Sequence, residues 1–222
     1  MIGRKVMGVM VLVITCASRL SAQVSVRGGA VVGRAAHRVV AGALVTSSGS
    51  LLGGTVAVVV GQRFEIQAEA IGGDLLTPSS PGLDDHKIAE ADLIAGMKVR
   101  PWLALQTGLS ARNFSNALAR QHWTTWRIGA EARIPLGFDE VTSLVRGYWM
   151  PVVSISGLSR ADVAIAAAVG MEWRRHRFGV TALYTFERYD FAAETGGQRL
   201  EDLSTLRLGL SVAWQLRSRK LQ

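Results

Sequence analysis

The sequence contains very little cysteine and no apolar run long enough to cross a membrane as a helix. Cys16 is the only cysteine among the 222 residues. A single cysteine excludes an intrachain disulfide and a zinc site built from several thiolates. A membrane-spanning helix needs about 20 consecutive apolar residues, and no segment meets that requirement. Apolar residues nevertheless make up 49% of the chain, so they must be organised in another way.

The N-terminus has the layout of a signal peptide. Arg4 and Lys5 are followed by the uncharged apolar run 6–16 and then by small residues. A short positive segment, an apolar segment and a small-residue cleavage site are typical of export signals. We expect cleavage after Ala22, so residues 1–22 are a predicted signal peptide and Gln23 begins the mature chain. Cleavage there also removes the only thiol.

Cys16 allows one alternative, in which the thiol is acylated and becomes the first residue of a lipoprotein. Thr15 precedes it. Lipid-anchor sites favour glycine, alanine or serine at that position. The sequence therefore favours a cysteine that is lost with the signal peptide.

The mature chain carries a mild positive charge. Removal of residues 1–22 leaves 22 basic and 17 acidic residues, a net charge of +5. This excess suits contact with anionic lipid or lipopolysaccharide. No cluster of lysine and arginine follows one face as a nucleic-acid site requires, so we expect no nucleic-acid partner.

Apolar and polar residues alternate with a period of two along most of the mature chain. Phe64, Ile66 and Ala68, for example, interleave with Glu65 and Gln67. Such alternation indicates strands with one apolar and one polar face. Regular segments occur at 63–70, 88–99, 103–112, 125–134, 163–173, 178–187 and 206–216, and less regular ones at 24–33, 53–60 and 141–150. The pattern predicts about ten strands, with eight as the alternative, close to the 9–11 residues that cross a bilayer at a tilt.

Short and long connections alternate between these strands. Short turns are expected near 61–62, 100–102, 135–140 and 174–177, and longer polar loops near 34–52, 73–87, 115–123, 151–161 and 190–202. This order is typical of a closed antiparallel up-and-down transmembrane β-barrel with short turns in the periplasm and long loops outside. We therefore predict an all-β barrel domain over 23–216, followed by a short basic tail over 217–222.

In a barrel surrounded by lipid the apolar face points outward, so the charged face must line the lumen. The predicted lumen charges are seven acidic and seven basic residues: Arg27, Glu65, Glu69, Glu90, Asp92, Lys98, Arg112, Arg127, Glu131, Arg133, Arg146, Glu172, Glu187 and Arg207. Unpaired charges would be costly in so narrow a space, and their balance predicts paired ones. The favoured interpretation is a structural ion-pair network, and the alternative is a selectivity lining.

The tryptophans lie near the ends of the predicted strands. Trp102, Trp173 and Trp214 lie at inner ends, and Trp123, Trp126 and Trp149 at outer ends, where Tyr148 and Tyr189 join them. Indole rings prefer the interface between membrane and water. The sequence therefore predicts two aromatic girdles.

These features together resemble the small outer-membrane β-barrel proteins of Gram-negative bacteria, the superfamily of porin-like domains. The resemblance rests on the signal peptide, the alternating strands, the order of turns and loops, and the apolar last strand 206–216. It implies a location in the cell outer membrane and contact with outer-membrane lipid or lipopolysaccharide and with the assembly machinery. Family members commonly end on an aromatic residue, whereas this chain continues past Trp214 and Leu216 into Arg-Ser-Arg-Lys-Leu-Gln.

The sequence supplies no catalytic constellation. His86 follows Asp84 and Asp85, and a carboxylate–histidine pair at a barrel rim can activate water. Adjacent residues point in different directions, however, and no second ligand cluster accompanies them, so we assign no catalytic residue, no metal site and no cofactor. We expect a non-enzymatic barrel with a structural, surface-interaction or narrow-pore role and an undefined surface partner. The alternatives are an outer-membrane rim hydrolase and a soluble exported lipid-binding barrel with its apolar face inward.

Overall fold

The computed structural model describes most of the predicted barrel domain. The described residues are 24–78, 85–116, 120–137, 140–158, 160–192 and 199–216. The predicted signal peptide and the basic tail lie outside them. Within these ranges no helix is long and apolar enough to span a membrane.

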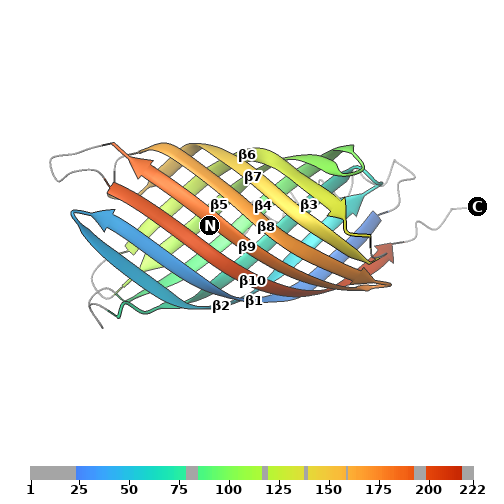
Figure 1. Ribbon diagram of the computed structural model, residues 1–222, viewed down its shortest axis with the longest axis horizontal. Helices are drawn as coiled ribbons and strands as arrows, with labels where there is room; N and C mark the ends of the chain where they lie inside the picture. Colours follow the sequence, from blue (N-terminus) through green and yellow to red (C-terminus); the bar gives the residue numbers. More distant parts are fainter. Residues whose placement is uncertain are drawn as a thin grey trace, which may run out of the picture.

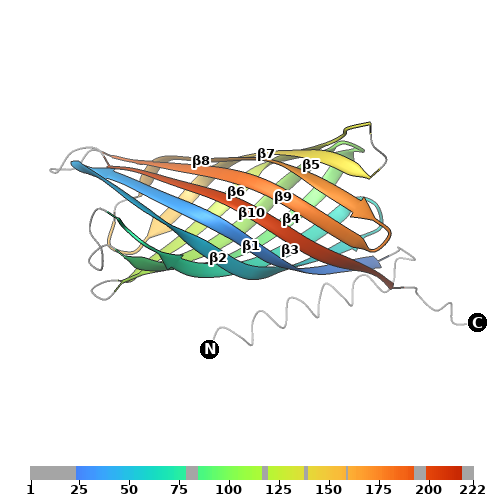
Figure 2. The same ribbon diagram turned by 60° about the horizontal axis from the view of Figure 1, so that its bottom comes forward.

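Ten antiparallel strands form one closed barrel (Figure 1). They are β1 Val24–Ala41, β2 Ala43–Val60, β3 Phe64–Leu75, β4 His86–Arg100, β5 Leu103–Ser115, β6 Arg120–Pro135, β7 Val141–Ile155, β8 Ala161–Arg175, β9 Phe178–Phe191 and β10 Arg199–Leu216. Each strand pairs with its neighbours in sequence, and β1 closes the ring by pairing with β10 (Figure 2). The predicted fold class is confirmed, with ten strands rather than eight.

Short turns gather at the end of the barrel where β1 begins and β10 ends, which we call the inner end (Figure 1). Two of these turns contain glycine in the left-handed region, with φ of 62° at Gly61 and 79° at Gly137. In a third turn the left-handed residue is His176, with φ of 53°. The remaining connections gather at the opposite, outer end.

The prediction of a loop over 34–52 is wrong, because β1 and β2 continue through this segment. They form a hairpin of two 18-residue strands whose pairing extends to Ala41 and Ala43 around Gly42, at φ 75°. The segment is rich in valine, serine and threonine, and valine and threonine favour strands. The predicted loop 190–202 is likewise shortened, because β9 reaches Phe191 and β10 begins at Arg199. The strands therefore continue further toward the outer end than the sequence pattern indicated.

The outward face of every strand contributes to an apolar belt. On β10 the belt contains Leu206, Leu208, Leu210, Trp214 and Leu216, each 49–65% exposed. Polar and charged residues replace apolar ones on the outward face above it, as at Arg34, Lys87, Arg188 and Asp202. The belt is thus bounded on the outer side, and the outer ends of the strands extend beyond it.

The lumen tolerates a side chain at some glycines and not at others. A Cβ at Gly129 would lie 2.0 Å from the carbonyl oxygen of Gly147 and 2.6 Å from Tyr148 Cδ1, whereas a Cβ at Gly209 meets nothing closer than 3.9 Å. We expect Gly129→Ala to destabilise the barrel by about 1–3 kcal/mol, as overpacking does, and Gly209→Ala to have little effect. Urea unfolding of both variants from lipid vesicles measures the difference, and equal effects would contradict the packing described here.

Candidate functional site

The inner part of the lumen holds an ion-pair network divided into two clusters. The central cluster is formed by Glu69, Glu90, Asp92, Arg112, Arg127, Glu187 and Arg207. The inner cluster is formed by Arg27, Glu65, Glu131, Arg133, Arg146, Glu172 and Arg174. Both clusters connect strands on opposite sides of the barrel.

Arg112 lies in the middle of the central cluster. Its Nε donates to Glu90 at 2.6 Å and its Nη2 donates to Glu187 at 2.7 Å, and its side chain is only 3% exposed. Arg127 approaches the other oxygen of Glu187 at 2.9 Å, and the Tyr189 hydroxyl also donates to this carboxylate at 2.7 Å. Arg207 extends the cluster to Glu69 and Glu90. Each of these three arginines contacts two carboxylates, which compensates for the burial of its charge.

The inner cluster is built around two glutamates. Glu131 accepts hydrogen bonds from Arg133 and Arg146. Glu172 accepts from Arg133 at 3.3 Å and from Arg174 at 2.6 Å. Arg27 joins through Glu65, at 2.7 Å.

The structure brings thirteen of the fourteen predicted lumen charges into these two clusters. Lys98 lies apart from them, in a small recess at the inner mouth beside Arg63 and Trp102. Arg174 was not among the predicted lumen residues, because its position at the end of β8 was assigned to a turn.

A cavity of about 140 Å³ lies between the clusters. Its lining includes Asp92, Arg127 and Arg207, and Asp92 Oδ1, Arg127 Nε and Arg207 Nε are buried there without a hydrogen-bond partner in the described protein. A mixture of donors and acceptors in this volume suits about five water molecules. The side chains therefore leave room for small polar molecules rather than for a wide channel.

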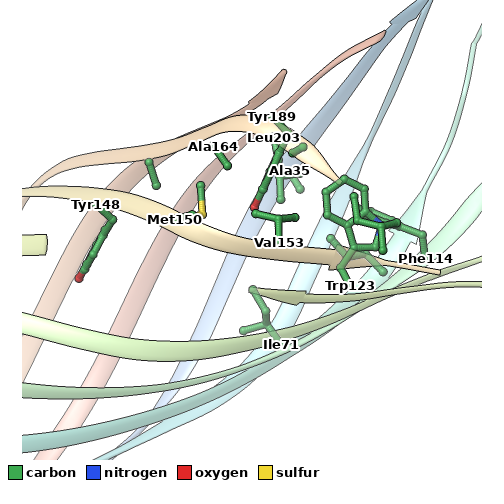
Figure 3. Close-up of a cluster of buried hydrophobic side chains, with 14 of the residues drawn as sticks. Ala35, Ile71, Phe114, Trp123, Tyr148, Met150, Val153, Ala164, Tyr189 and Leu203 are labelled. Carbon is green, nitrogen blue, oxygen red and sulfur yellow. The ribbon is translucent and has the colours of Figure 1, made fainter. Parts of the chain in front are cut away.

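The outer part of the lumen is apolar. Phe114, Trp123, Tyr189 and Phe191 stack edge to face, with Trp123 5.0 Å from Tyr189 and 5.9 Å from Phe114 between ring centroids. Val153, Met150 and Leu203 continue this core (Figure 3). We call it the outer plug.

The outer plug corrects the predicted outer girdle. Trp123 and Tyr189 are each 2% exposed and Tyr148 is 9% exposed, and all three point into the barrel (Figure 3). Trp123 shares its face of β6 with Arg127, and Tyr189 shares its face of β9 with Glu187. The two-residue period therefore places these rings inside, where they pack with one another.

The other predicted girdle residues remain on the outward face. Trp102, Trp126, Trp149 and Trp214 are 41–60% exposed, and Trp173 is partly covered. Trp126 lies where the outward face of β6 changes from the apolar Ile128 to the polar Thr124. It therefore marks the outer boundary of the apolar belt.

A histidine–carboxylate contact lies beside the outer plug, above the apolar belt. His37 Nε2 lies 3.0 Å from Glu201 Oε2, and His37 Nδ1 lies 3.4 Å from His86 Nε2. Because a carboxylate only accepts, His37 donates to Glu201 through Nε2. Burial raises the pKa of Glu201, but the hydrogen bond and charge of His37 and the charge of Arg199 outweigh it and hold this pKa below its ordinary value.

The contact between His37 and Glu201 was missed in the sequence, because 164 positions separate the two residues. The candidate residue Asp85 accepts a hydrogen bond from the backbone of Thr77 at 2.6 Å, and Asp84 lies outside the described residues. Within the described ranges, no three histidine, cysteine or acidic residues are arranged to hold a metal ion.

Comparisons with known proteins bear on the fold. No protein-family model matches the chain, and no curated protein matches it. The β domain of the Bordetella autotransporter BrkA is similar, with a TM-score of 0.50 and 13% identity over 84% of this chain and 99% of that chain. This likeness shows the fold, a closed β-barrel. Two further matches have lower TM-scores: the NalP translocator domain of Neisseria meningitidis (0.45, 13% identity, 94% and 95% covered) and Ail of Yersinia pestis (0.39, 11% identity, 85% and 98% covered).

Loss of Arg112 should be costly because it leaves Glu90 and Glu187 buried with fewer partners. We expect Arg112→Met to destabilise the barrel by about 3–5 kcal/mol. The control is Lys87→Gln, which removes an exposed pair with Asp74 at 3.8 Å and should cost about 0–1 kcal/mol. Urea unfolding from vesicles measures both. Similar costs for the two variants would show that the central cluster does not stabilise the fold.

The depressed pKa of Glu201 predicts an acid dependence of stability. Its folded-state value lies below the ordinary 4.5, so the stabilisation is present above pH 4.5 and is lost as the pH falls through the folded-state pKa. We expect wild type to be more stable than Glu201→Gln at pH 7, with the difference shrinking toward pH 3. A difference in unfolding free energy that is constant with pH would contradict this assignment.

Proposed function

We propose that the protein is an integral barrel of the outer membrane of a Gram-negative bacterium, with a structural or surface-interaction role and no catalytic one. The observation that carries the proposal is the polarity of the barrel wall. Leucine and tryptophan side chains of β10 are about half exposed on the outside, whereas Arg112 and Glu187 are almost fully buried inside. A barrel in water requires the reverse arrangement.

The height of the apolar belt supports a membrane environment. It spans Leu206–Leu216 on β10, Phe178–Phe186 on β9 and Trp126–Ile134 on β6. These lengths agree with the roughly 9–11 residues that a tilted strand needs to cross a bilayer. A soluble lipid-binding barrel is less well supported, because the cavity here is small and lined by charges such as Arg127 and Asp92.

Lipid and assembly partners follow from that environment. Outer-membrane lipid or lipopolysaccharide would surround the belt, and Arg34 and Arg38 point outward just above it, where anionic headgroups would lie. Insertion of a closed barrel would depend on the outer-membrane assembly machinery. The surface partner is not defined by these contacts.

The filled lumen favours an interaction role over wide-pore transport. The outer plug joins strands from around the ring into one apolar core, so the outer end forms a stiff platform. The hairpin of β1 and β2 continues from this platform to its tip at Gly42, with Leu44 56% exposed nearby. A stiff paired hairpin that extends beyond the belt can present its tip to another surface.

A hydrolytic role is supported less well. His37 and His86 contact each other, and both rings pack against Phe114 inside the barrel, with centroid distances of 4.6 Å and 5.4 Å. This stacking holds the rings as part of the outer plug. Our proposal therefore assigns them a structural role.

Fractionation tests the proposal. We expect the protein in the detergent-extracted outer-membrane fraction, with a gel mobility that differs between unheated and boiled samples because a closed barrel resists cold SDS. Protein in the soluble periplasm with no heat-dependent shift would contradict the proposal and favour a soluble barrel.

Planar-bilayer recording tests the closed lumen. Because the ion pairs and the outer plug fill the interior, we expect no stable open-channel current from the inserted protein. An open porin recorded under the same conditions is the positive control. A steady conductance from heat-shiftable protein would contradict a closed lumen without contradicting membrane insertion.

A further inference from the structure

A shallow groove lies on the outside of the barrel, near its inner end. It crosses β8, β9, β10 and β1 and has a volume of about 620 Å³. Its apolar lining includes Gly28, Ala30, Trp173, Phe178, Leu210 and Val212. These residues belong to the outward face, so the groove is continuous with the apolar belt.

The strand register explains the shape of the groove. Gly28 lies opposite Val212, Val212 opposite Phe178, and Phe178 opposite Arg175, which forms one row across four strands. Gly28 has no side chain, so the row is low at β1, whereas Phe178 is 64% exposed at β9. The ring of Trp214 lies beside Gly28, 3.5 Å from where its Cβ would be. The surface is therefore lowest at Gly28, beside the Trp214 ring, and rises toward Phe178.

Basic residues border the inner end of the groove. Arg175 and His176 are part of its lining. Arg175 contacts Glu140 at 3.4 Å, with side-chain exposures of 63% and 39%, and exposed pairs of this kind contribute little. A phosphate can therefore replace Glu140 at Arg175, or share Arg175 with it. Arginine binds phosphate with two parallel hydrogen bonds.

Exposed arginines outnumber exposed acidic residues in the described turns of the inner end. The described turns and adjoining strand ends there expose five arginines: Arg63, Arg100, Arg174, Arg175 and Arg177. Glu140 is the acidic residue described in these turns. In sequence Asp139 precedes it, and Arg217, Arg219 and Lys220 follow the end of β10. At the outer end basic and acidic residues are mixed, as in the pairs Lys87–Asp74 and Arg188–Asp202.

We propose that this groove binds an anionic phospholipid, with an acyl chain along Gly28 and Phe178 and the phosphate at Arg175. The inference rests on the proposed membrane location and adds a defined lipid site to it. An apolar channel leading to a cluster of arginines matches an anionic phospholipid in both parts. A soluble anion would match only the arginines.

Native mass spectrometry of the full-length mature protein, titrated with phosphatidylglycerol in detergent, tests the site. We expect Arg175→Gln to weaken phosphatidylglycerol binding about tenfold through loss of the phosphate contact. Gly28→Leu should weaken it similarly by filling the groove, and Ala30→Leu provides a second filling variant. Glu140→Gln should strengthen binding, because it removes a competing carboxylate.

Matched controls separate the groove from general effects. Lys87→Gln removes an exposed cation on the outward face of β4 at the outer end of the barrel, and Ala91→Leu enlarges a belt residue on the same strand. Neither should change phosphatidylglycerol binding. Equal weakening by these controls, or unchanged binding in Arg175→Gln and both groove-filling variants, would overturn the proposal. The proposal would also be overturned if soluble glycerol phosphate competed for the site as effectively as the whole lipid does.

The gel-mobility shift of each variant keeps the two proposals distinct. A variant that retains the heat-dependent shift but binds phosphatidylglycerol like wild type counts against the lipid site alone. Loss of the shift in wild type itself counts against the membrane barrel, and the lipid site falls with it.

Discussion

The pairing of β1 with β10 is the interaction on which the rest of the structure depends. It runs without a break from Val24 opposite Leu216 to Ala41 opposite Arg199 and removes both free edges of the sheet. In lipid, each unpaired backbone group would cost several kcal/mol. A sheet whose apolar outer face lies in lipid must therefore close into a ring without free edges. Closure of ten strands then encloses a narrow interior, and every inward charge must find a partner within it.

The interior is filled in two ways, one beside the apolar belt and one further toward the outer end. Beside the apolar belt, shared ion pairs such as Arg112 with Glu90 and Glu187 fill the space. Further out, where the outward face becomes charged, Trp123, Tyr189 and Leu203 form a core like that of a soluble protein. The change fits the change of surroundings, because an apolar interior is favoured once the wall faces water. Together the two fillings make a closed, stiff support for the outer end.

The sequence predicted the parts of the barrel that follow one rule throughout. Alternation identified the strands inside the belt and the side on which residues such as Arg127 and Glu131 lie. The girdle prediction failed at the outer ends because Trp123 and Tyr189 were assigned by residue type, although their spacing from Arg127 and Glu187 places them inside. The same spacing along β1 relates His37 to Arg27, and it was missed because 34–52 was taken as a loop. The contact between His37 and Glu201 needed the closure of the ring, which no local pattern contains.

The measurement that tests the account most directly is residue-by-residue lipid contact along β10. Single cysteines would replace each position from Leu206 to Leu216 in the mature chain, carry a fluorescent label, and be exposed to lipids bearing a quencher at mid-chain. The account predicts quenching at even positions such as Leu208 and Leu210 and protection at odd positions such as Arg207 and Gly209. Quenching at the odd positions, or no alternation, would contradict a barrel with its apolar face in lipid and its charges inside.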